Sequence, residues 1–280
     1  MLIRLGYEIE FNVPQPVAVV ALLSVHPSRQ SDLREPDEPH IEPASQAERF
    51  LDRFGNRCTR FVAPAGKLRL WNSTLIRDAG EQDAVNYQAR QHPIQELPVD
   101  LLPYLMNSRY CEVDRLSNIA TELFGNTALG WTRVQSIVNW VHNSVQFGYQ
   151  HARATRTALE VYTERVGVCR DFQHLAIAFC RCMMIPARYA TGYLGDIGVP
   201  ASSCPMDFSA WFEAYLDGRW WTFDARHNQP RIGRVLIATG LDAADVAMTT
   251  SFGMAELAKF NVTTYEVNDL TNSGRLHANQ

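Results

Sequence analysis

Cys169 is the residue whose type and position point most directly to chemistry. It follows Gly167, which allows a sharp turn, and apolar residues recur at helical spacing from Cys169 to Met184, so the sequence predicts that Cys169 lies in the first turn of a helix. Free N–H groups and the positive end of the helix dipole at that position favour a thiolate and can stabilise an oxyanion. Cys180 and Cys182 lie in the middle of the same helix and lack both advantages. Cys169 is therefore predicted to be the nucleophile of a thiol acyl-transfer reaction.

A second chemical group, Asp224, follows on a predicted β-hairpin. Asp217-Gly218 is a strong two-residue turn signal between two strands over residues 208–224. Because side chains alternate along a strand, Ser209 then shares a face with Asp224 and lies diagonally across from it, within side-chain reach. The opposite face is apolar almost throughout, so it is predicted to face the core. The face left for chemistry carries Ser209, Trp211, Glu213, Thr222 and Asp224.

Three ordered segments of the chain resemble bacterial transglutaminase-like proteins. The resemblance implies a papain-like core over roughly residues 110 to 240, in which a Cys-His-Asp triad combines a cysteine at a helix start with a histidine and an aspartate on neighbouring strands. It also implies a β-rich domain ahead of this core. The matching segments are Gly167-Val168-Cys169-Arg170-Asp171-Phe172, Ile185-Pro186-Ala187-Arg188-Tyr189 with Gly192-Tyr193-Leu194, and Ala210-Trp211-Phe212-Glu213-Ala214-Tyr215 with Trp221-Thr222-Phe223-Asp224.

The resemblance assigns two members of the triad and exposes a gap at the third. Cys169 matches the nucleophile, and Asp224 matches the aspartate that orients the base. The family's histidine precedes Ala-Trp, and here that position is Ser209. Serine cannot act as a base near neutral pH, so the usual Cys-His proton transfer is not available from this position.

Three other residues are weighed as a replacement base. His227 follows Asp224 by three residues, and strict alternation along the strand places it on the core face. This objection weakens if the strand ends at Asp224, because Asn228-Gln229-Pro230 is a turn signal. The alternative role of His227 is that of a surface or capping histidine. His174 points away from the thiol, about 140° around the helix, and is expected to be a packed helix histidine. Asp207 shares the face of Ser209, but a carboxylate disfavours a thiolate unless it takes the proton itself.

Neighbouring aromatic and acidic residues are given simpler roles. Asp171 is expected to cap the helix that begins at Cys169. Trp211 is a candidate substrate-binding residue because it shares the face of Asp224, and Asp207 is a second candidate. Trp221 lies on the apolar face and is expected to pack in the core.

The composition excludes several classes of protein. The 280 residues carry a net charge of −4, so no basic surface suggests a nucleic-acid partner. No apolar run reaches the length of a membrane span, and the first seven residues read as a strand instead of a signal peptide, so a cytoplasmic location is expected. The six cysteines are too sparse for a disulfide framework, and no zinc or calcium motif is present. No metal or cofactor is predicted, and the oligomeric state is left open.

The chain is predicted to have an α+β fold in two parts. Residues 1–105 are rich in strand signals and are expected to form a sandwich-like N-terminal domain, with a long exposed loop over residues 27–43. Residues 106–268 are expected to form the transglutaminase-like core, with helices over 114–124, 132–145, 155–164 and 169–184 and a closing strand over 260–267. Residues 269–280 are expected to be a flexible tail.

Two functions from different classes remain open. The first is thiol-dependent acyl transfer or amide hydrolysis, of the cysteine-peptidase type, on a peptide or γ-glutamyl-type substrate, carried by Cys169 and Asp224. The second is a non-catalytic protein that binds a peptide or acyl ligand on a degenerate transglutaminase-like fold. Ser209 at the histidine position motivates the second hypothesis.

Overall fold

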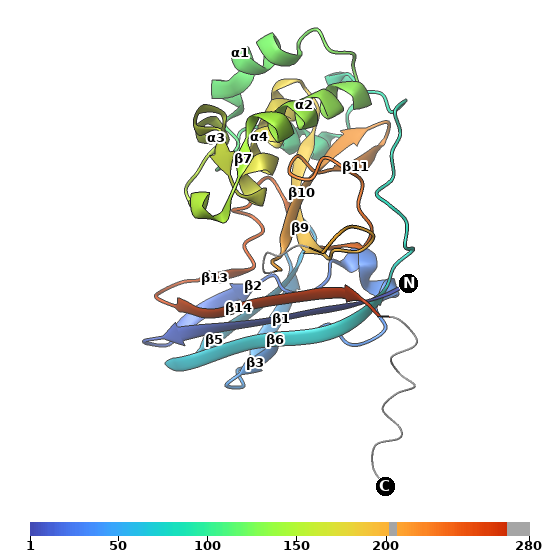
Figure 1. Cartoon of the computed structure of the whole chain (residues 1–280). Coiled ribbons are helices and arrows are strands. Elements are labelled where there is room, and N and C mark those ends of the chain that lie inside the picture. The colour runs from blue at the N-terminus through green and yellow to red at the C-terminus, as the bar shows by residue number, and fades with distance from the viewer. Residues whose placement is uncertain (202–205, 268–280) are drawn as a thin grey trace.

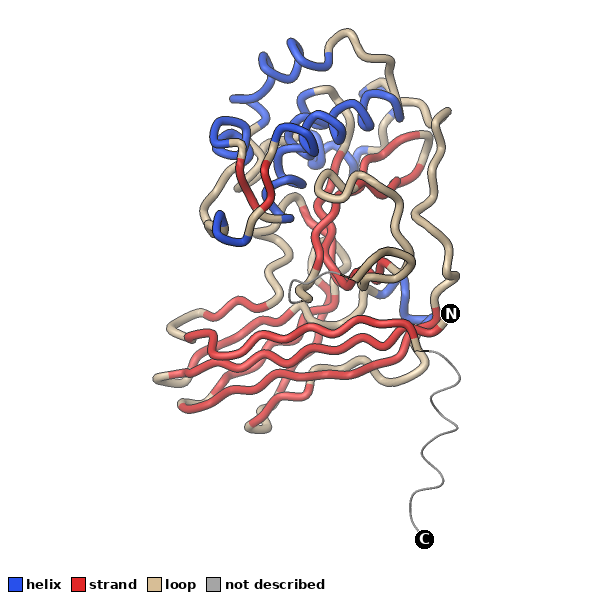
Figure 2. The backbone as a smooth tube through the Cα atoms, viewed as in Figure 1, coloured by secondary structure: helices blue, strands red, loops and turns tan. Residues whose placement is uncertain are grey.

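The computed structural model describes residues 1–201 and 206–267; the predicted tail over residues 269–280 lies outside this range. Long strands gather at one end of the molecule and helices at the other (Figure 2). The strand-rich end contains two four-stranded sheets, with orders β14-β1-β6-β3 and β13-β2-β5-β4. Their strands are β1 (Leu2–Val13), β2 (Val17–Ala21), β3 (His40–Glu42), β4 (Ala47–Leu51), β5 (Arg57–Ala63), β6 (Gly66–Arg77), β13 (Thr249–Ser251) and β14 (Glu256–Glu266).

The two sheets enclose their apolar side chains between them. Along β1, Ile3, Leu5, Tyr7 and Ile9 are buried and alternate in part with more exposed polar positions, as expected for a strand with one face on a core. The second sheet contributes buried residues such as Phe61 to the same cluster. This arrangement forms the sandwich-like layer pair that the sequence predicts (Figure 1).

The last two strands pair with strands of this sandwich, although they fall within residues 106–268, the range predicted for the core. β14 pairs with β1 along nearly its whole length, from Glu256 opposite Asn12 to Glu266 opposite Ile3. β13 pairs with β2, with Thr249 opposite Ala21. The predicted core range of residues 106–268 therefore includes two strands that hydrogen-bond to the N-terminal sheets, and we propose that they complete the first domain.

The other end of the molecule is a mixed layer of helices on an antiparallel sheet. The sheet has the order β11-β10-β9-β12, and α4 packs against β9 and β10 while α1, α2 and α3 pack around it (Figure 1). The helices are α1 (Val113–Phe124), α2 (Trp131–Ser144), α3 (Ala158–Glu164) and α4 (Cys169–Cys182); the strands are β9 (Ala187–Leu194), β10 (Ser209–Leu216), β11 (Arg219–Phe223) and β12 (Arg234–Gly240). Short elements complete the description: η1 (Pro27–Asp32), η2 (Ile94–Glu96), η3 (Val99–Leu105), η4 (Tyr149–His151), β7 (Gln146–Phe147) and β8 (Val166–Gly167).

Helix α4 is the central element of this layer. Every residue from Asp171 to Cys182 is buried, including polar ones, so this helix is enclosed on all sides instead of on one stripe. Its buried Arg181 is satisfied by main-chain carbonyls, among them that of Ala187 at 2.9 Å from Nη2. Such full enclosure fixes the position of the helix N-terminus, where Cys169 lies.

The sandwich and the core layer are joined by specific contacts. The ring of Phe208 packs against those of Tyr7, Tyr193 and Phe260, so it touches the β14-β1-β6-β3 sheet of the sandwich and the sheet of the core layer. The Asn56 side chain and the main chain of Thr239 exchange two hydrogen bonds of 2.8 Å. The two regions therefore pack against each other in the neighbourhood of the hairpin that carries the predicted site.

Candidate active site

Cys169 is the first residue of α4, as the sequence predicts. Its side chain is partly exposed, whereas Cys180 and Cys182, further along the same helix, are buried. The carboxylate of Asp171 turns back and accepts the N–H of Val168 at 3.0 Å, which satisfies a main-chain donor ahead of the helix. The capping role predicted for Asp171 is thus present in the structure.

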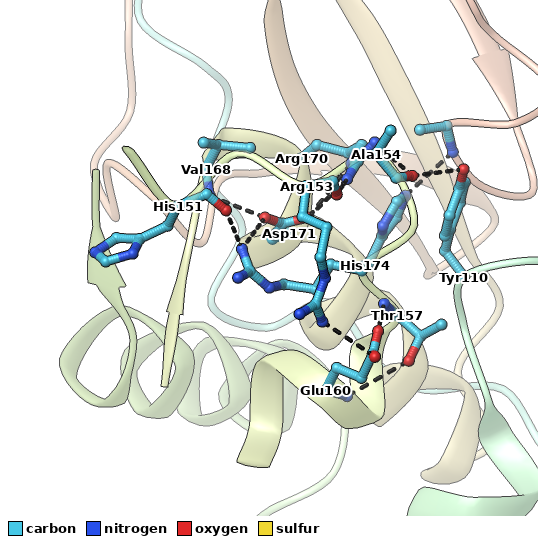
Figure 3. Close-up of polar contacts among 12 residues, drawn as sticks. Tyr110, His151, Arg153, Ala154, Thr157, Glu160, Val168, Arg170, Asp171 and His174 are labelled. Atoms are coloured by element: carbon cyan, nitrogen blue, oxygen red, sulfur yellow. Dashed lines mark hydrogen bonds and ion pairs between the residues drawn. The ribbon is translucent and has the colours of Figure 1, made fainter. Parts of the chain in front are cut away.

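Asp171 also anchors a buried network of charges (Figure 3). Its carboxylate is fully buried and lies 3.3 Å from Nη1 of Arg156 and 3.2 Å from Nη2 of Arg170. Arg156 in turn pairs with Glu164 of α3 at 3.0 Å and donates to the carbonyl of His151. Two arginines and a neighbouring helix therefore hold the start of α4 in place.

Gly167 serves this network by its small size. The backbone of Gly167 does not adopt the left-handed conformation that favours glycine. The sharp turn predicted at this position therefore does not explain why the residue is a glycine. A Cβ at Gly167 would lie 2.7 Å from Cβ of Asp171, which is closer than real side chains approach. Glycine is required because the buried Asp171 side chain occupies the space.

The thiol of Cys169 is not activated by the helix alone. Burial raises its pKa to about 11, while Arg226 and the main-chain N–H of Arg170 lower it, and the carboxylates of Asp207 and Asp224 raise it further. The expected preference for a thiolate at the helix N-terminus is outweighed, because desolvation disfavours the charged form. At neutral pH the group is a thiol, and its use as a nucleophile requires a base.

This pKa leads to a testable expectation for the reactivity of Cys169. Alkylation by iodoacetamide is expected to accelerate by about tenfold per pH unit between roughly pH 7 and 10, because only the thiolate reacts and its fraction rises in this way below the pKa. Peptide mapping by mass spectrometry gives the rate at Cys169 alone. Arg226→Gln is expected to slow the reaction at each pH, since it removes a cation that stabilises the thiolate. A plateau below about pH 8 would contradict the raised pKa.

The predicted hairpin register is present in the structure, but its second strand ends one residue early. Leu216 lies opposite Arg219 and Phe212 opposite Phe223. β11 stops at Phe223, and the chain then forms a turn in which the N–H of Asn228 donates to the carbonyl of Asp224 at 2.8 Å. Strict alternation therefore does not apply beyond Phe223, and His227 is free to fold back toward Asp224.

His227 and Asp224 form a hydrogen-bonded pair. Nδ1 of His227 lies 2.9 Å from Oδ2 of Asp224, and the main-chain N–H groups of Arg226 and His227 donate to Oδ1. Gln173 and Arg234 complete the shell at 3.1 Å and 3.0 Å. Burial alone would raise the pKa of Asp224, but Arg234 and His227 outweigh it and hold this pKa well below its usual value. Asp224 is therefore ionised and fixes His227 through Nδ1.

One small polar cavity brings most of the predicted site residues together. Its volume is about 110 Å³, and Cys169, Ser209, Asp207 and His227 all line it. Ser209 is buried at the start of β10, opposite Gly192 of β9. The other lining residues are Tyr149, Leu194, Asp196, Met206, Phe208, Arg226 and Arg231.

Trp211 and His174 lie outside the lining of this cavity, and so does Asp224, which contacts the lining residue His227. Trp211, a candidate substrate-binding residue, is only 2% exposed, and Arg234 covers its ring at 5.2 Å. It is absent from the lining of both cavities that contain Cys169, so the expectation of substrate contact is corrected to packing beneath the site. His174 is fully buried, stacks on Tyr110 at 4.9 Å and accepts the N–H of Ala243, as expected for a packed helix histidine.

Cys169 also lines a larger and more apolar groove of about 570 Å³. Its walls come from the core layer and from the C-terminal strands, including Tyr189, Ala210, Met248 and Phe260. The thiol thus lies where a small polar cavity meets a wide apolar groove.

Among residues 1–201 and 206–267, no group of three His, Cys, Asp or Glu side chains is arranged to hold a metal ion. No helix in these ranges is long and apolar enough to cross a membrane.

Several functional residues are missed by the sequence prediction. Gln173 lies one helical turn after Cys169, so its spacing could have indicated that it faces the same way. Arg226 and Arg234 have no distinguishing local signal, because their importance depends on where β11 ends and β12 begins. Met248 and Phe260 belong to a segment whose partners lie at the other end of the sequence.

The chain is similar to several known proteins. A family model described as the transglutaminase-like superfamily matches residues 117–225. A candidate cysteine protease from Cytophaga hutchinsonii has a crystal structure that is 30% identical, with a TM-score of 0.82 over 96% of this chain and 91% of that one. An uncharacterised protein of Mycobacterium leprae is 24% identical over 213 residues, which are 73% of this chain and 75% of that protein. The periplasmic domain of TgpA from Pseudomonas aeruginosa is 13% identical, with a TM-score of 0.40 over 80% of this chain and 88% of that one.

The chain therefore belongs to the transglutaminase-like superfamily. The family resemblance and the α+β fold class predicted from the sequence are both confirmed. The fold and the Cytophaga relative support, in general terms, a thiol-dependent catalytic type of function.

Proposed function

We propose that this protein is a cysteine-dependent enzyme that transfers or hydrolyses the acyl group of an amide. Cys169 is the nucleophile, His227 is the base in place of the missing family histidine, and Asp224 orients His227. One observation carries the proposal: Nδ1 of His227 is bound to the Asp224 carboxylate at 2.9 Å while the histidine lines the same cavity as the thiol. A nucleophile, a base and a group that orients the base are the parts that such a reaction requires.

The reaction proceeds through a thioester. His227 takes the proton from the Cys169 thiol, Sγ bonds to the amide carbonyl carbon, and the C–N bond breaks as His227 returns the proton to the leaving amine. Water or a second amine then attacks the thioester, gives its proton to His227, and releases the acyl product while the thiol is regenerated. The N–H groups in the first turn of α4 stabilise the oxyanion in both steps.

The two cavities suggest which parts of the substrate lie on either side of the thiol. A peptide or small amide of partly apolar character fits the groove lined by Met248 and Phe260, and the polar cavity takes the part of the substrate next to the scissile bond.

Because five free cysteines lie in the described residues, we also propose a reducing compartment such as the cytoplasm.

A second function, ligand binding without turnover, is favoured by two observations. Ser209 stands where the family places its histidine, and the Cys169 pKa of about 11 leaves the thiol uncharged at neutral pH. In that case the cavities hold a peptide or acyl ligand, and Cys169→Ala leaves its binding intact.

Thiol-dependent turnover distinguishes the two functions. Wild-type protein and Cys169→Ala are assayed against casein and a panel of peptidyl and γ-glutamyl aminomethylcoumarin amides, and mass spectrometry detects an acyl adduct on Cys169. Turnover in the wild type that falls to background in Cys169→Ala is the expected result, and Cys182→Ala is the matched control in the same helix. Turnover that appears only after Ser209→His would instead favour the binding function.

A further inference from the structure

Two side chains of opposite charge line the polar cavity without forming an ion pair with each other. Arg226 and Asp207 both line it beside Cys169. Neither side chain appears in any of the ion pairs formed by residues 1–201 and 206–267, although 24 such contacts lie within 4.0 Å. A cation and an anion held apart in one small cavity are suited to a ligand that carries both charges.

Arg226 is held in position before any ligand binds. Its guanidinium lies over the ring of Phe147 at 3.9 Å, its main-chain N–H donates to Asp224, and its carbonyl is 2.8 Å from Nδ1 of His142. Stacking on an aromatic face leaves the N–H edge of a guanidinium available for a carboxylate. An arginine that is already ordered loses less side-chain entropy when it binds a ligand.

A second arginine, Arg231, contributes an N–H donor without a hydrogen-bond partner to the lining of the polar cavity. Arg231 lines the cavity and is 5% exposed. Its Nη2 donates to the carbonyl of Gly195 at 2.9 Å and lies 3.7 Å from Asp196, but its buried Nε has no hydrogen-bond partner in the structure. Buried polar groups rarely remain unpaired, so this N–H is consistent with a site that a ligand or solvent completes.

Both lone charges lie near the reacting sulfur. Arg226 lowers the pKa of the Cys169 thiol and Asp207 raises it, so each is close enough to act on this group. A ligand that bridges Arg226 and Asp207 therefore places its next atoms beside Sγ. The carbonyl that reacts must be only a short chain away from the charged end.

Resting on the proposed function, we propose that this cavity binds the free α-amino-acid end of a side-chain amide, such as a γ-glutamyl or β-aspartyl amide. Arg226, with Arg231, takes the α-carboxylate, and Asp207 takes the α-ammonium group. The side-chain carbonyl, one or two methylenes further, reaches Cys169, and the leaving amine lies in the apolar groove. The thioester then forms on the side-chain carbonyl, and water or an amine releases the acidic amino acid or its new amide, as in the steps above.

This assignment separates such substrates from ordinary peptides. A glutamine within a protein chain has neither charge, because its α-amino and α-carboxyl groups are in peptide bonds. The N-terminus of a peptide offers an ammonium group without a carboxylate on the same carbon, and the C-terminus offers the reverse. Only a side-chain amide of an amino acid brings both charges to one end while its scissile carbonyl lies at the other.

Binding to full-length Cys169→Ala protein tests the assignment without requiring turnover. The probe is γ-L-glutamyl-7-amino-4-methylcoumarin, and calorimetry compares it with its N-acetyl derivative and its α-methyl ester. Each blocked form is expected to bind roughly tenfold to hundredfold more weakly, because one charge-assisted contact is lost. Arg226→Gln and Asp207→Asn, each added to Cys169→Ala, are expected to cause losses of similar size.

Matched controls lie on the hairpin away from the cavity. Arg219 stacks on Trp221 at 4.2 Å much as Arg226 stacks on Phe147, and Asp217 lies in the hairpin turn; Arg219→Gln and Asp217→Asn are expected to leave binding unchanged. Equal binding of free and blocked probes, or no binding of the free probe, would overturn the assignment. Selective binding of the free probe without turnover in the wild type would support the cavity and contradict the proposed catalysis.

Discussion

His227→Ala is expected to lower thiol-dependent turnover by about 10²- to 10⁴-fold, the range lost when a general base is removed. The reason is that Ser209 cannot take the proton of Cys169, whose pKa of about 11 makes proton removal necessary at neutral pH. The measurement is the steady-state rate on whichever amide the wild type turns over. The folded state is checked by thermal unfolding, because His227 contacts Asp224 from a turn at the surface of the core.

The matched control restores a base at the position where the family carries it. Ser209→His in the His227→Ala background is expected to recover part of the lost turnover, since Ser209 lines the same cavity as Cys169. His40→Ala removes an exposed histidine of β3, outside the lining of both cavities that contain Cys169, and is expected to leave the rate within a few-fold of the wild type. An unchanged rate in His227→Ala would contradict the role of His227 and return the question of the base to Asp207.

Asp171→Ala is expected to lower the free energy of unfolding by about 3–5 kcal/mol, the cost of removing one partner of a buried charge pair. The Asp171 side chain is fully buried, and its loss leaves Arg156, only 6% exposed, with Glu164 as its remaining carboxylate. The N–H of Val168 would also lose its acceptor. Urea unfolding at neutral pH measures the change.

Two variants define what the Asp171 result means. Asp171→Asn keeps an oxygen acceptor for Val168 and is expected to cost less than the alanine variant. Asp114→Ala removes an exposed acid from the first turn of α1 and is expected to cost at most about 1 kcal/mol. If Asp171→Ala costs no more than Asp114→Ala, the buried network does not hold the start of α4.

Local signals were sufficient to predict the framework of the site. The helix start at Cys169 follows from helical periodicity, and the pairing of Leu216 with Arg219 follows from the turn formed by Asp217-Gly218. Both features depend on residues close together in the sequence. The family resemblance rests on the same segments, so it was visible for the same reason.

The remaining features depend on contacts between distant parts of the chain. The position of His227 depends on β11 ending at Phe223, and one residue decides which way the following side chains point. Trp211 was expected to be open, but Arg234 from the adjacent β12 covers it. The pairing of β14 with β1 joins the two ends of the sequence, and no local pattern specifies the partner of a strand.

The pairing of β14 with β1 has a consequence for the order in which the fold is completed during synthesis. The ribosome makes β1 long before β14, and Phe260 of β14 is part of the groove beside Cys169. One edge of β1 stays unpaired, and the groove lacks a wall, until β14 has been translated. A nascent chain that has not reached β14 therefore carries the Cys169 thiol beside an incomplete groove, so the surroundings of the thiol are finished only after β14 has paired with β1.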